Sequence, residues 1–167
     1  MRKNALTLAV AGALLVASGS AGAATKTATL GVSAVVNANC IISSQNLAFG
    51  NYDGTTAKTG TADVTVRCSN QTLYGVSLST GGGTFAQRLL SGSGSNKLQY
   101  NLYTTAAATT IWGDGTLSTG IVSDTGTGMS AANAKTHTVY GQLPDNAFNQ
   151  GAPTGNYNDS ITVTVTY

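Results

Sequence analysis

Alternation of apolar and polar side chains runs through most of the chain after residue 26. A period of two residues is typical of β-strands with one buried face. The clearest segments are 27–36, 39–50, 62–70, 72–80, 97–105, 135–143 and 159–167. Stretches rich in Gly, Ser, Asn and Asp separate them, as expected for turns. Short strands separated by turns of uneven length predict an all-β sandwich without internal repeats.

The same alternation predicts which side chains share the apolar face of each strand. In the final segment these side chains alternate with threonines up to residue 167. The predicted apolar faces comprise Val64, Val66, Cys68, Tyr74, Val76, Leu78, Leu98, Tyr100, Leu102, His137, Val139, Gly141, Leu143, Ile161, Val163, Val165 and Tyr167.

The first 23 residues have the pattern of a secretory signal peptide. Arg2 and Lys3 form a charged start, residues 5–17 form an apolar run, and the small residues 21–23 provide a cleavage site. A retained membrane anchor is the alternative, but the apolar run is too short to span a bilayer comfortably. The sequence therefore predicts an exported chain whose mature part starts near residue 24.

Charge narrows the range of partners. The chain has eight Lys and Arg, six Asp and no Glu, and removal of residues 1–23 takes away two of the basic side chains. The mature chain is then nearly neutral and has no basic patch, so nucleic acid is not expected as a partner. A net charge near zero also protects poorly against self-association.

Cys40 and Cys68 are the only two cysteines of the chain. In an exported protein they favour one disulfide, which would stabilise the fold by roughly 3–4 kcal/mol on the chain-entropy account. A metal site is the alternative, but two thiols and one histidine fall short of the usual four ligands. No metal and no other cofactor is expected.

Residues that could carry chemistry are sparse, so no enzyme is expected. His137 lies on a patterned strand without a nucleophile motif beside it. The segment 112–117 lacks the repeated acidic residues of a calcium loop and is expected to be a turn. Trp112 with Tyr100 and Tyr103 offers a platform on which a sugar ring could stack, although such aromatics are more often core residues. A self-complete carbohydrate-binding module is therefore kept as the alternative function.

The N-terminal segment raises the main question. A patterned strand at 27–36 precedes the first covalent anchor of the chain, Cys40. In an ordinary sandwich this strand would pair within its own domain. Periodicity alone does not distinguish that arrangement from pairing with another chain.

Residues 88–116 carry the most distinctive motifs. They are Arg88-Leu89, Leu98-x-Tyr100-Asn101-Leu102-Tyr103 and Trp112-Gly113-Asp114-Gly115-Thr116. Supporting motifs are Cys40 with Phe49-Gly50, Val64-x-Val66-x-Cys68, Val139-Tyr140-Gly141, and Tyr157-x-Asp159 with the strand that follows it. On these residues the chain resembles the spore coat U domain family, the subunits of archaic chaperone–usher pili in Gram-negative bacteria.

The resemblance implies an incomplete immunoglobulin-like β-sandwich with a groove between its sheets. A periplasmic chaperone would fill the groove during export, and at an outer-membrane usher the N-terminal strand of the next copy would replace it. The chain would thus be a structural pilus subunit that polymerises head to tail into cell-surface fibres for adhesion and biofilm formation. It would belong to the fibre body or act as an adaptor, rather than as a two-domain tip adhesin.

On this basis the chain has three expected parts: a signal peptide at 1–23, a donor strand at 24–39 and a pilin sandwich at 40–167. The expected edge of the acceptor groove is the last strand, with Ile161, Val163, Val165 and Tyr167. The donor side chains expected to enter the groove lie on one face of a strand about 30 Å long. They are Ala28, Leu30, Val32, Ala34 and Val36.

Overall fold

A computed structural model describes residues 22–167 of the chain. The predicted signal peptide lies outside the described residues, except for residues 22 and 23. The chain divides into two units, Met1–Val35 and Val36–Tyr167. We describe the two units separately, beginning with the second.

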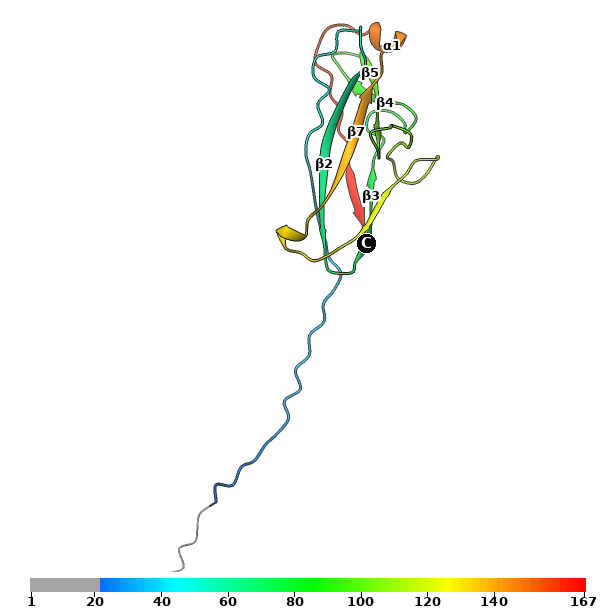
Figure 1. Cartoon of the computed structure of the whole chain (residues 1–167). Coiled ribbons are helices and arrows are strands. Elements are labelled where there is room, and N and C mark those ends of the chain that lie inside the picture. Colours follow the sequence, from blue (N-terminus) through cyan, green and yellow to red (C-terminus); the bar gives the residue numbers. More distant parts are fainter. Residues whose placement is uncertain (1–21) are drawn as a thin grey trace, which may run out of the picture. The chain divides into compact units, whose positions relative to one another are not determined.

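The regular secondary structure of the second unit is almost entirely β-strand (Figure 1). The helical parts of the described residues are the 3-10 turn η1 (Ala131–Asn133) and the single-turn helix α1 (Ala147–Gln150). Within residues 22–167 no helix has the length and apolar character needed to cross a membrane. The strands are β1 (Cys40–Ser44), β2 (Lys58–Cys68), β3 (Leu73–Leu78), β4 (Arg88–Ser91), β5 (Lys97–Tyr103), β6 (Val122–Thr125), β7 (Lys135–Leu143) and β8 (Val163–Thr166).

These strands form two antiparallel sheets. The large sheet has five strands in the order β1-β2-β7-β5-β4, and the small sheet has three in the order β6-β3-β8. β1 ends the large sheet, β8 ends the small sheet, and these two strands are neighbours. Two packed antiparallel sheets of this kind form an immunoglobulin-like sandwich, which confirms the predicted fold class.

The core between the sheets follows the predicted alternation. Eleven of the side chains assigned to apolar faces are at most 6% exposed: Val64, Val66, Cys68, Tyr74, Val76, Leu78, Leu98, Tyr100, Leu102, Val139 and Leu143. Trp112 is also fully buried, and its indole N–H donates to the carbonyl oxygen of Val76 at 2.9 Å. Burial of one face on each strand is what drives the two sheets together.

Strand boundaries differ from the prediction at several places. β4 and β6 have four residues each, too few for alternation to reveal them. The strand expected over 39–50 ends at Ser44, and the strand expected over 159–167 begins at Val163. After Ser44 the chain packs over Gly60 and Gly141 instead of pairing with β2. Before Val163 the chain bonds to Ser91 and Ser79.

A buried arginine links the two sheets. Arg88, the first residue of β4 in the large sheet, is fully buried. Its guanidinium donates to the carbonyl oxygens of Ser79 and Trp112, each at 2.8 Å, and to Oδ1 of Asn101 at 2.7 Å. Ser79 directly follows β3 of the small sheet. A buried charge needs such partners, because each one replaces a hydrogen bond to water.

A second polar link joins β3 to β7. The hydroxyl of Tyr74 lies 2.9 Å from Nε2 of His137. Burial raises the pKa of Tyr74 to about 12, and the negative charge of Asp124 contributes to the rise. Burial lowers the pKa of His137, the positive charge of Lys135 lowers it further, and Asp124 opposes both.

The lowered pKa of His137 predicts that acid destabilises the fold. In the unfolded chain this imidazole binds a proton near its ordinary pKa of about 6.5, whereas the folded chain resists protonation. Its stabilising contribution is therefore complete above pH 6.5 and is lost as the pH falls through the lower folded pKa. We expect the free energy of unfolding, measured with urea and Trp112 fluorescence, to be lower at pH 5 than at pH 7.

The variant His137→Gln should reduce this difference, because His137 is the one histidine of the chain and Asp side chains titrate mainly at lower pH. An equal loss of stability between pH 7 and pH 5 in both proteins would contradict the assignment.

Candidate binding groove

The N-terminal segment is extended and exposed. Residues 22–39 form no helix or strand. The five predicted donor side chains are all exposed, among them Leu30 at 85%, Val32 at 87% and Val36 at 90%. An alternating segment with both of its faces in water leaves its apolar face unburied, and burial of that face is favourable.

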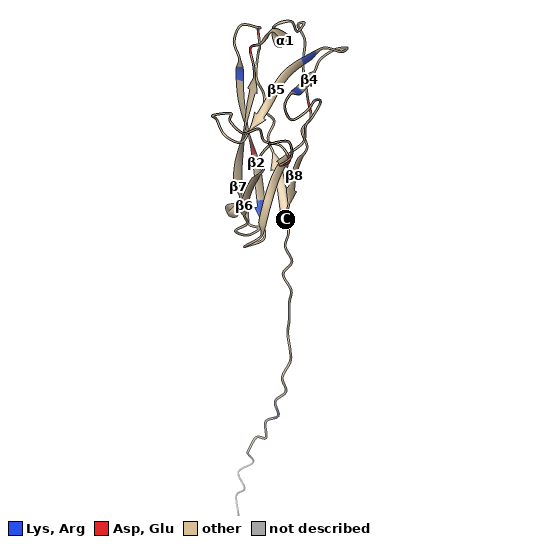
Figure 2. Ribbon diagram, turned by 90° about the vertical axis from the view of Figure 1, so that its right-hand side faces the viewer, with Lys and Arg blue, Asp and Glu red and all other residues tan. Residues whose placement is uncertain are grey.

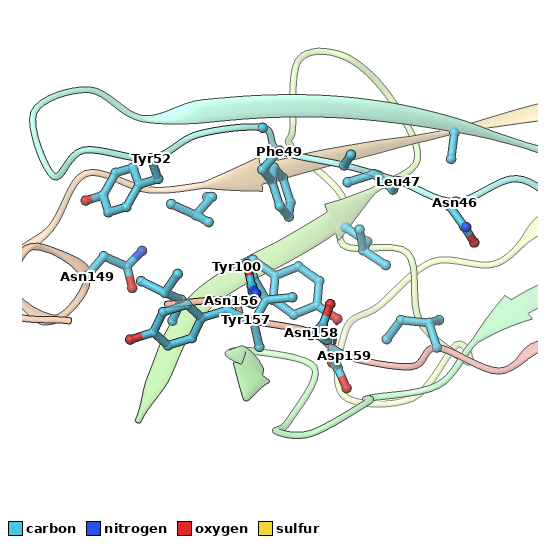
Figure 3. A pocket seen from close by; sticks show the side chains of 18 of the residues that line it. Asn46, Leu47, Phe49, Tyr52, Tyr100, Asn149, Asn156, Tyr157, Asn158 and Asp159 are labelled. Atoms are coloured by element: carbon cyan, nitrogen blue, oxygen red, sulfur yellow. Dashed lines mark hydrogen bonds between the residues drawn. The ribbon is translucent and has the colours of Figure 1, made fainter. Parts of the chain in front are cut away.

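A groove of about 1380 Å³ lies in the second unit, between the edges of the two sheets (Figure 3). The first wall is the segment 44–54, which continues from β1, and the second wall is the segment 152–163, which leads into β8. Its volume exceeds that of most small-molecule sites, which hold about 300–1,000 Å³. The apolar floor comprises Ala62, Val64, Leu78, Leu90, Leu98, Tyr100, Leu102, Val139 and Leu143.

Two glycines position the first wall. Gly60 on β2 and Gly141 on β7 are opposite each other in the ladder. A Cβ atom on Gly141 would lie 2.9 Å from the side chain of Leu47 and 3.0 Å from the ring of Phe49. A Cβ atom on Gly60 would lie 2.7 Å from the carbonyl oxygen of Ala48. The missing side chains thus leave a recess into which the chain after β1 packs, and this packing takes residues 46–50 away from the β1–β2 ladder.

Aromatic side chains narrow the groove between this wall and the floor. The rings of Phe49 and Tyr100 meet edge to face, with centroids 5.9 Å apart. Phe49 comes from the first wall and Tyr100 from β5, and Tyr157 of the second wall lies near them (Figure 3). Phe49 and Tyr157 are only half-buried, so an occupant of the groove would cover more of their apolar surface.

The second wall contacts both sheets. Asn158 forms two backbone hydrogen bonds with Ser91 of β4, at 2.7 and 2.9 Å. Four residues later, the backbone N–H of Thr162 donates to the hydroxyl of Ser79, and its carbonyl oxygen accepts from the N–H of Ser79. The wall therefore begins on the edge of the large sheet and ends on the small sheet.

The sheet edges beside the groove have backbone groups without strand partners. Among the described residues, β1 pairs only with β2, and β8 pairs only with β3. A strand at the edge of a sheet presents a row of N–H and C=O groups that can pair with another extended chain. The groove thus combines an apolar floor with hydrogen-bonding edges.

The predicted groove edge is only partly in the lining. Ile161 and Val163 line the groove, whereas Val165 is half-buried against the core and Tyr167 is 57% exposed. Sequence reasoning missed most of the lining. The alternation of Leu47 with Phe49 was a usable signal for the first wall. Residues 152–158 of the second wall lie in a stretch that composition marks as a turn, so this part of the wall gave no such signal.

A disulfide fixes the start of the sandwich, directly after the N-terminal segment. Cys40 and Cys68 form a disulfide and are opposite each other in the β1–β2 ladder, with Cα atoms 4.1 Å apart. Next to it, the backbone N–H of Asn39 donates to the hydroxyl of Ser69 at 3.1 Å. The sandwich is therefore anchored from residue 39 onward.

The platform for sugar stacking is not formed. Trp112 is completely buried and Tyr100 is 5% exposed, so neither ring offers a face to a ligand in water. The alternative of a carbohydrate site is therefore not supported by these residues: the indole ring packs in the core, as is more frequent for such aromatics, and its N–H donates to the carbonyl oxygen of Val76. Charged side chains in the described residues are few and scattered (Figure 2), and no cluster among them could hold a metal ion.

Among the described residues, the chain is thus an immunoglobulin-like sandwich with unpaired strand edges beside an apolar groove. Residues 26–164 match the Spore Coat Protein U domain, and the chain belongs to this family. It is 32% identical over 184 aligned residues to Protein U of Myxococcus xanthus, covering 99% of this chain and 98% of that protein.

The fold also resembles that of a solved structure. The similar chain belongs to the CsuC–CsuE chaperone–tip adhesion subunit pre-assembly complex from archaic chaperone–usher Csu pili of Acinetobacter baumannii. The TM-score is 0.58 at 22% identity, and the match covers 79% of this chain and 40% of the other. The present chain therefore corresponds to less than half of that protein, and at this identity the likeness concerns the fold.

The recess that positions the first wall predicts a pair of contrasting variants. Gly141→Ala should lower the free energy of unfolding by about 1–3 kcal/mol, because the added methyl group overpacks against Leu47 and Phe49. Leu47→Ala in the same chain should restore part of this loss, since the methyl group then meets only the ring of Phe49.

Gly60→Ala should be restored less by Leu47→Ala, because its methyl group meets the carbonyl oxygen of Ala48 at 2.7 Å in addition to the side chain of Leu47 at 3.0 Å. Urea unfolding of the single and double variants measures both couplings. Additive effects of Gly141→Ala and Leu47→Ala would contradict the packing described here.

Proposed function

We propose that this chain is a structural subunit of a chaperone–usher pilus, and that its groove binds the N-terminal segment of another copy. The observation that carries the proposal is the groove of about 1380 Å³ between the segment that continues from β1 and the segment that leads into β8. Family membership supports the proposal, as does the likeness to a chain from a chaperone–pilus subunit complex.

The N-terminal segment has the length and pattern that such a groove requires. The nine residues 28–36 extend over about 30 Å as a strand, and their alternation directs one face to the floor. Leu30 and Val32 are 85% and 87% exposed, so their burial in the groove of another copy would contribute about 1.5–3 kcal/mol each. Backbone hydrogen bonds to both edges would add to this contribution.

The direction of the contact explains why a fibre forms. The donor segment and the groove are different surfaces, so each copy donates to one neighbour and accepts from another. Such heterologous contacts generate open fibres when the rotation between copies does not close a ring. The nearly neutral charge of the mature chain also permits close association of many copies.

The same groove would bind a periplasmic chaperone before assembly. An empty groove with unpaired edges is prone to unspecific strand pairing, so a transient occupant protects the subunit until it reaches the outer-membrane usher. On this account the chain is exported through the periplasm and ends at the cell surface, where the fibres serve adhesion and biofilm formation. Its role is structural rather than catalytic.

Leu30→Asp should abolish assembly, because it places a charge on the apolar floor of the groove. The measurement is SDS gel electrophoresis without boiling, after expression in a bacterial periplasm with the cognate chaperone and usher. The unchanged chain should give a ladder at multiples of the subunit mass that collapses on boiling, and Leu30→Asp should give the monomer alone.

Thr29→Asp is the matched control, since it places the same charge one residue away on the opposite face of the strand. It should retain the ladder. A monomer band from folded, chaperone-free, unchanged protein would contradict the proposal, and so would a normal ladder from Leu30→Asp.

A further inference from the structure

The second wall of the groove passes from the large sheet to the small sheet between Asn158 and Thr162. Asn158 pairs with β4 of the large sheet, and Thr162 pairs with the chain that follows β3 of the small sheet. Asp159 lies between these two attachments and is half-buried. Figure 3 places Asp159 beside Asn158 and close to Tyr100. Its contacts therefore decide where this wall lies relative to the floor.

The carboxylate of Asp159 joins three separate segments. Its two oxygens accept from the backbone N–H of Gly82 at 3.0 and 3.1 Å. Oδ2 also accepts from the hydroxyl of Tyr100 at 2.6 Å, and Oδ1 accepts from the N–H of Ser160 at 2.8 Å. Bonds to a charged acceptor are stronger than neutral ones, so this carboxylate is a firm attachment point.

The turn that receives the carboxylate is shaped for it. Gly81 has φ +63°, in the left-handed region that favours glycine. A Cβ atom on Gly81 would collide with the carboxylate of Asp159. Because Gly81 has no side chain, the carboxylate of Asp159 can come close enough to the turn to accept from the backbone N–H of Gly82.

The attachment reaches the floor of the groove through Tyr100. This residue is 5% exposed, and its ring contacts Phe49 of the first wall. Burial raises the pKa of Tyr100, and the hydrogen bond and charge of Asp159 raise it further, while Arg88 opposes them. The pKa of Tyr100 therefore depends on whether the carboxylate of Asp159 accepts from its hydroxyl.

We propose that Asp159 is the positioning residue of the acceptor groove: bound to Gly82 and Tyr100, it holds the second wall apart from the first so that a donor strand can enter. The inference rests on the proposed function, because it concerns how the groove admits the donor. Without this attachment the half-buried side chains of the two walls approach each other, since burial of their apolar surface is favourable. A smaller fraction of the molecules then has the open groove, and the association rate of the donor strand falls in proportion to that fraction.

The test measures uptake of a fluorescein-labelled peptide with the sequence of residues 24–39. The mature chain is refolded at low concentration with the peptide in excess, and fluorescence anisotropy gives the association and dissociation rates. The variants are Asp159→Asn, Tyr100→Phe and both together. Asp114→Asn is the matched control. Like Asp159, Asp114 accepts from a backbone N–H, in this case that of Thr116, but it lies in an exposed turn outside the groove lining.

We expect Asp159→Asn to slow association about tenfold, as befits the loss of charge-assisted hydrogen bonds, and to leave dissociation nearly unchanged. Tyr100→Phe should slow association by a smaller factor. The double variant should match Asp159→Asn alone, because both substitutions break one network. Asp114→Asn should bind like the unchanged chain.

A spectroscopic readout separates positioning from a general loss of structure. The near-ultraviolet absorbance of a tyrosine shifts to shorter wavelength when its hydroxyl loses a hydrogen bond to a carboxylate, so the difference spectrum of Asp159→Asn against the unchanged chain at pH 7 should show this shift. Asp114→Asn should show no such shift. The near-ultraviolet circular dichroism of buried Trp112 should be retained in every variant that folds.

The outcomes are distinguishable. If the unchanged chain takes up the peptide and Asp159→Asn does so at the same rate, the positioning role is wrong while the proposed function stands. If the folded, unchanged chain takes up no peptide, the proposed function fails and the inference fails with it. If Asp159→Asn does not fold, Tyr100→Phe decides, and an unchanged rate in that variant overturns the proposal.

Discussion

The rest of the structure depends on two strand edges that have no strand partner among residues 22–167. β1 ends the large sheet, β8 ends the small sheet, and a groove opens where their walls diverge. Backbone groups at such edges are satisfied by water or by another extended chain. The floor beneath them is apolar, so binding of an extended chain is more favourable than hydration, because the chain buries the floor. On the proposed function, the segment 28–36, whose apolar side chains are exposed, supplies the partner strand to the groove of another copy.

A sandwich with an open groove needs other attachments between its sheets. The Tyr74–His137 pair joins β3 of the small sheet to β7 of the large sheet, whereas the Cys40–Cys68 disulfide joins β1 to β2 within the large sheet. Arg88 connects β4 to the end of β3 through buried carbonyl oxygens, and every buried side-chain polar atom of the described residues has a partner. These polar links are directional, so they fix the spacing of the sheets more closely than apolar packing alone. A fixed spacing is what an inserted strand requires.

Much of this fold could be predicted from the sequence, because alternation reports directly on burial. The inward faces of β2, β3, β5 and β7 were all predictable, and the disulfide followed from two cysteines in a chain predicted to be exported. β4 and β6 were missed because four residues carry too little periodicity. The groove was harder to foresee. Its walls run outside the regular strands, and their positions depend on Gly60, Gly141 and Asp159, whose contacts arise only when distant segments meet.

The most direct measurement of the central claim is hydrogen–deuterium exchange of the amides at 28–36, compared between the monomeric and the assembled protein. In the monomer these amides should exchange at rates typical of an unstructured chain. If the segment inserts into the groove of another copy, its exchange should slow by roughly a hundredfold or more on assembly, because its amides become part of a sheet. Protection of the strand edges beside the groove should rise in the same sample. Equally fast exchange at 28–36 in the assembled protein would contradict the account.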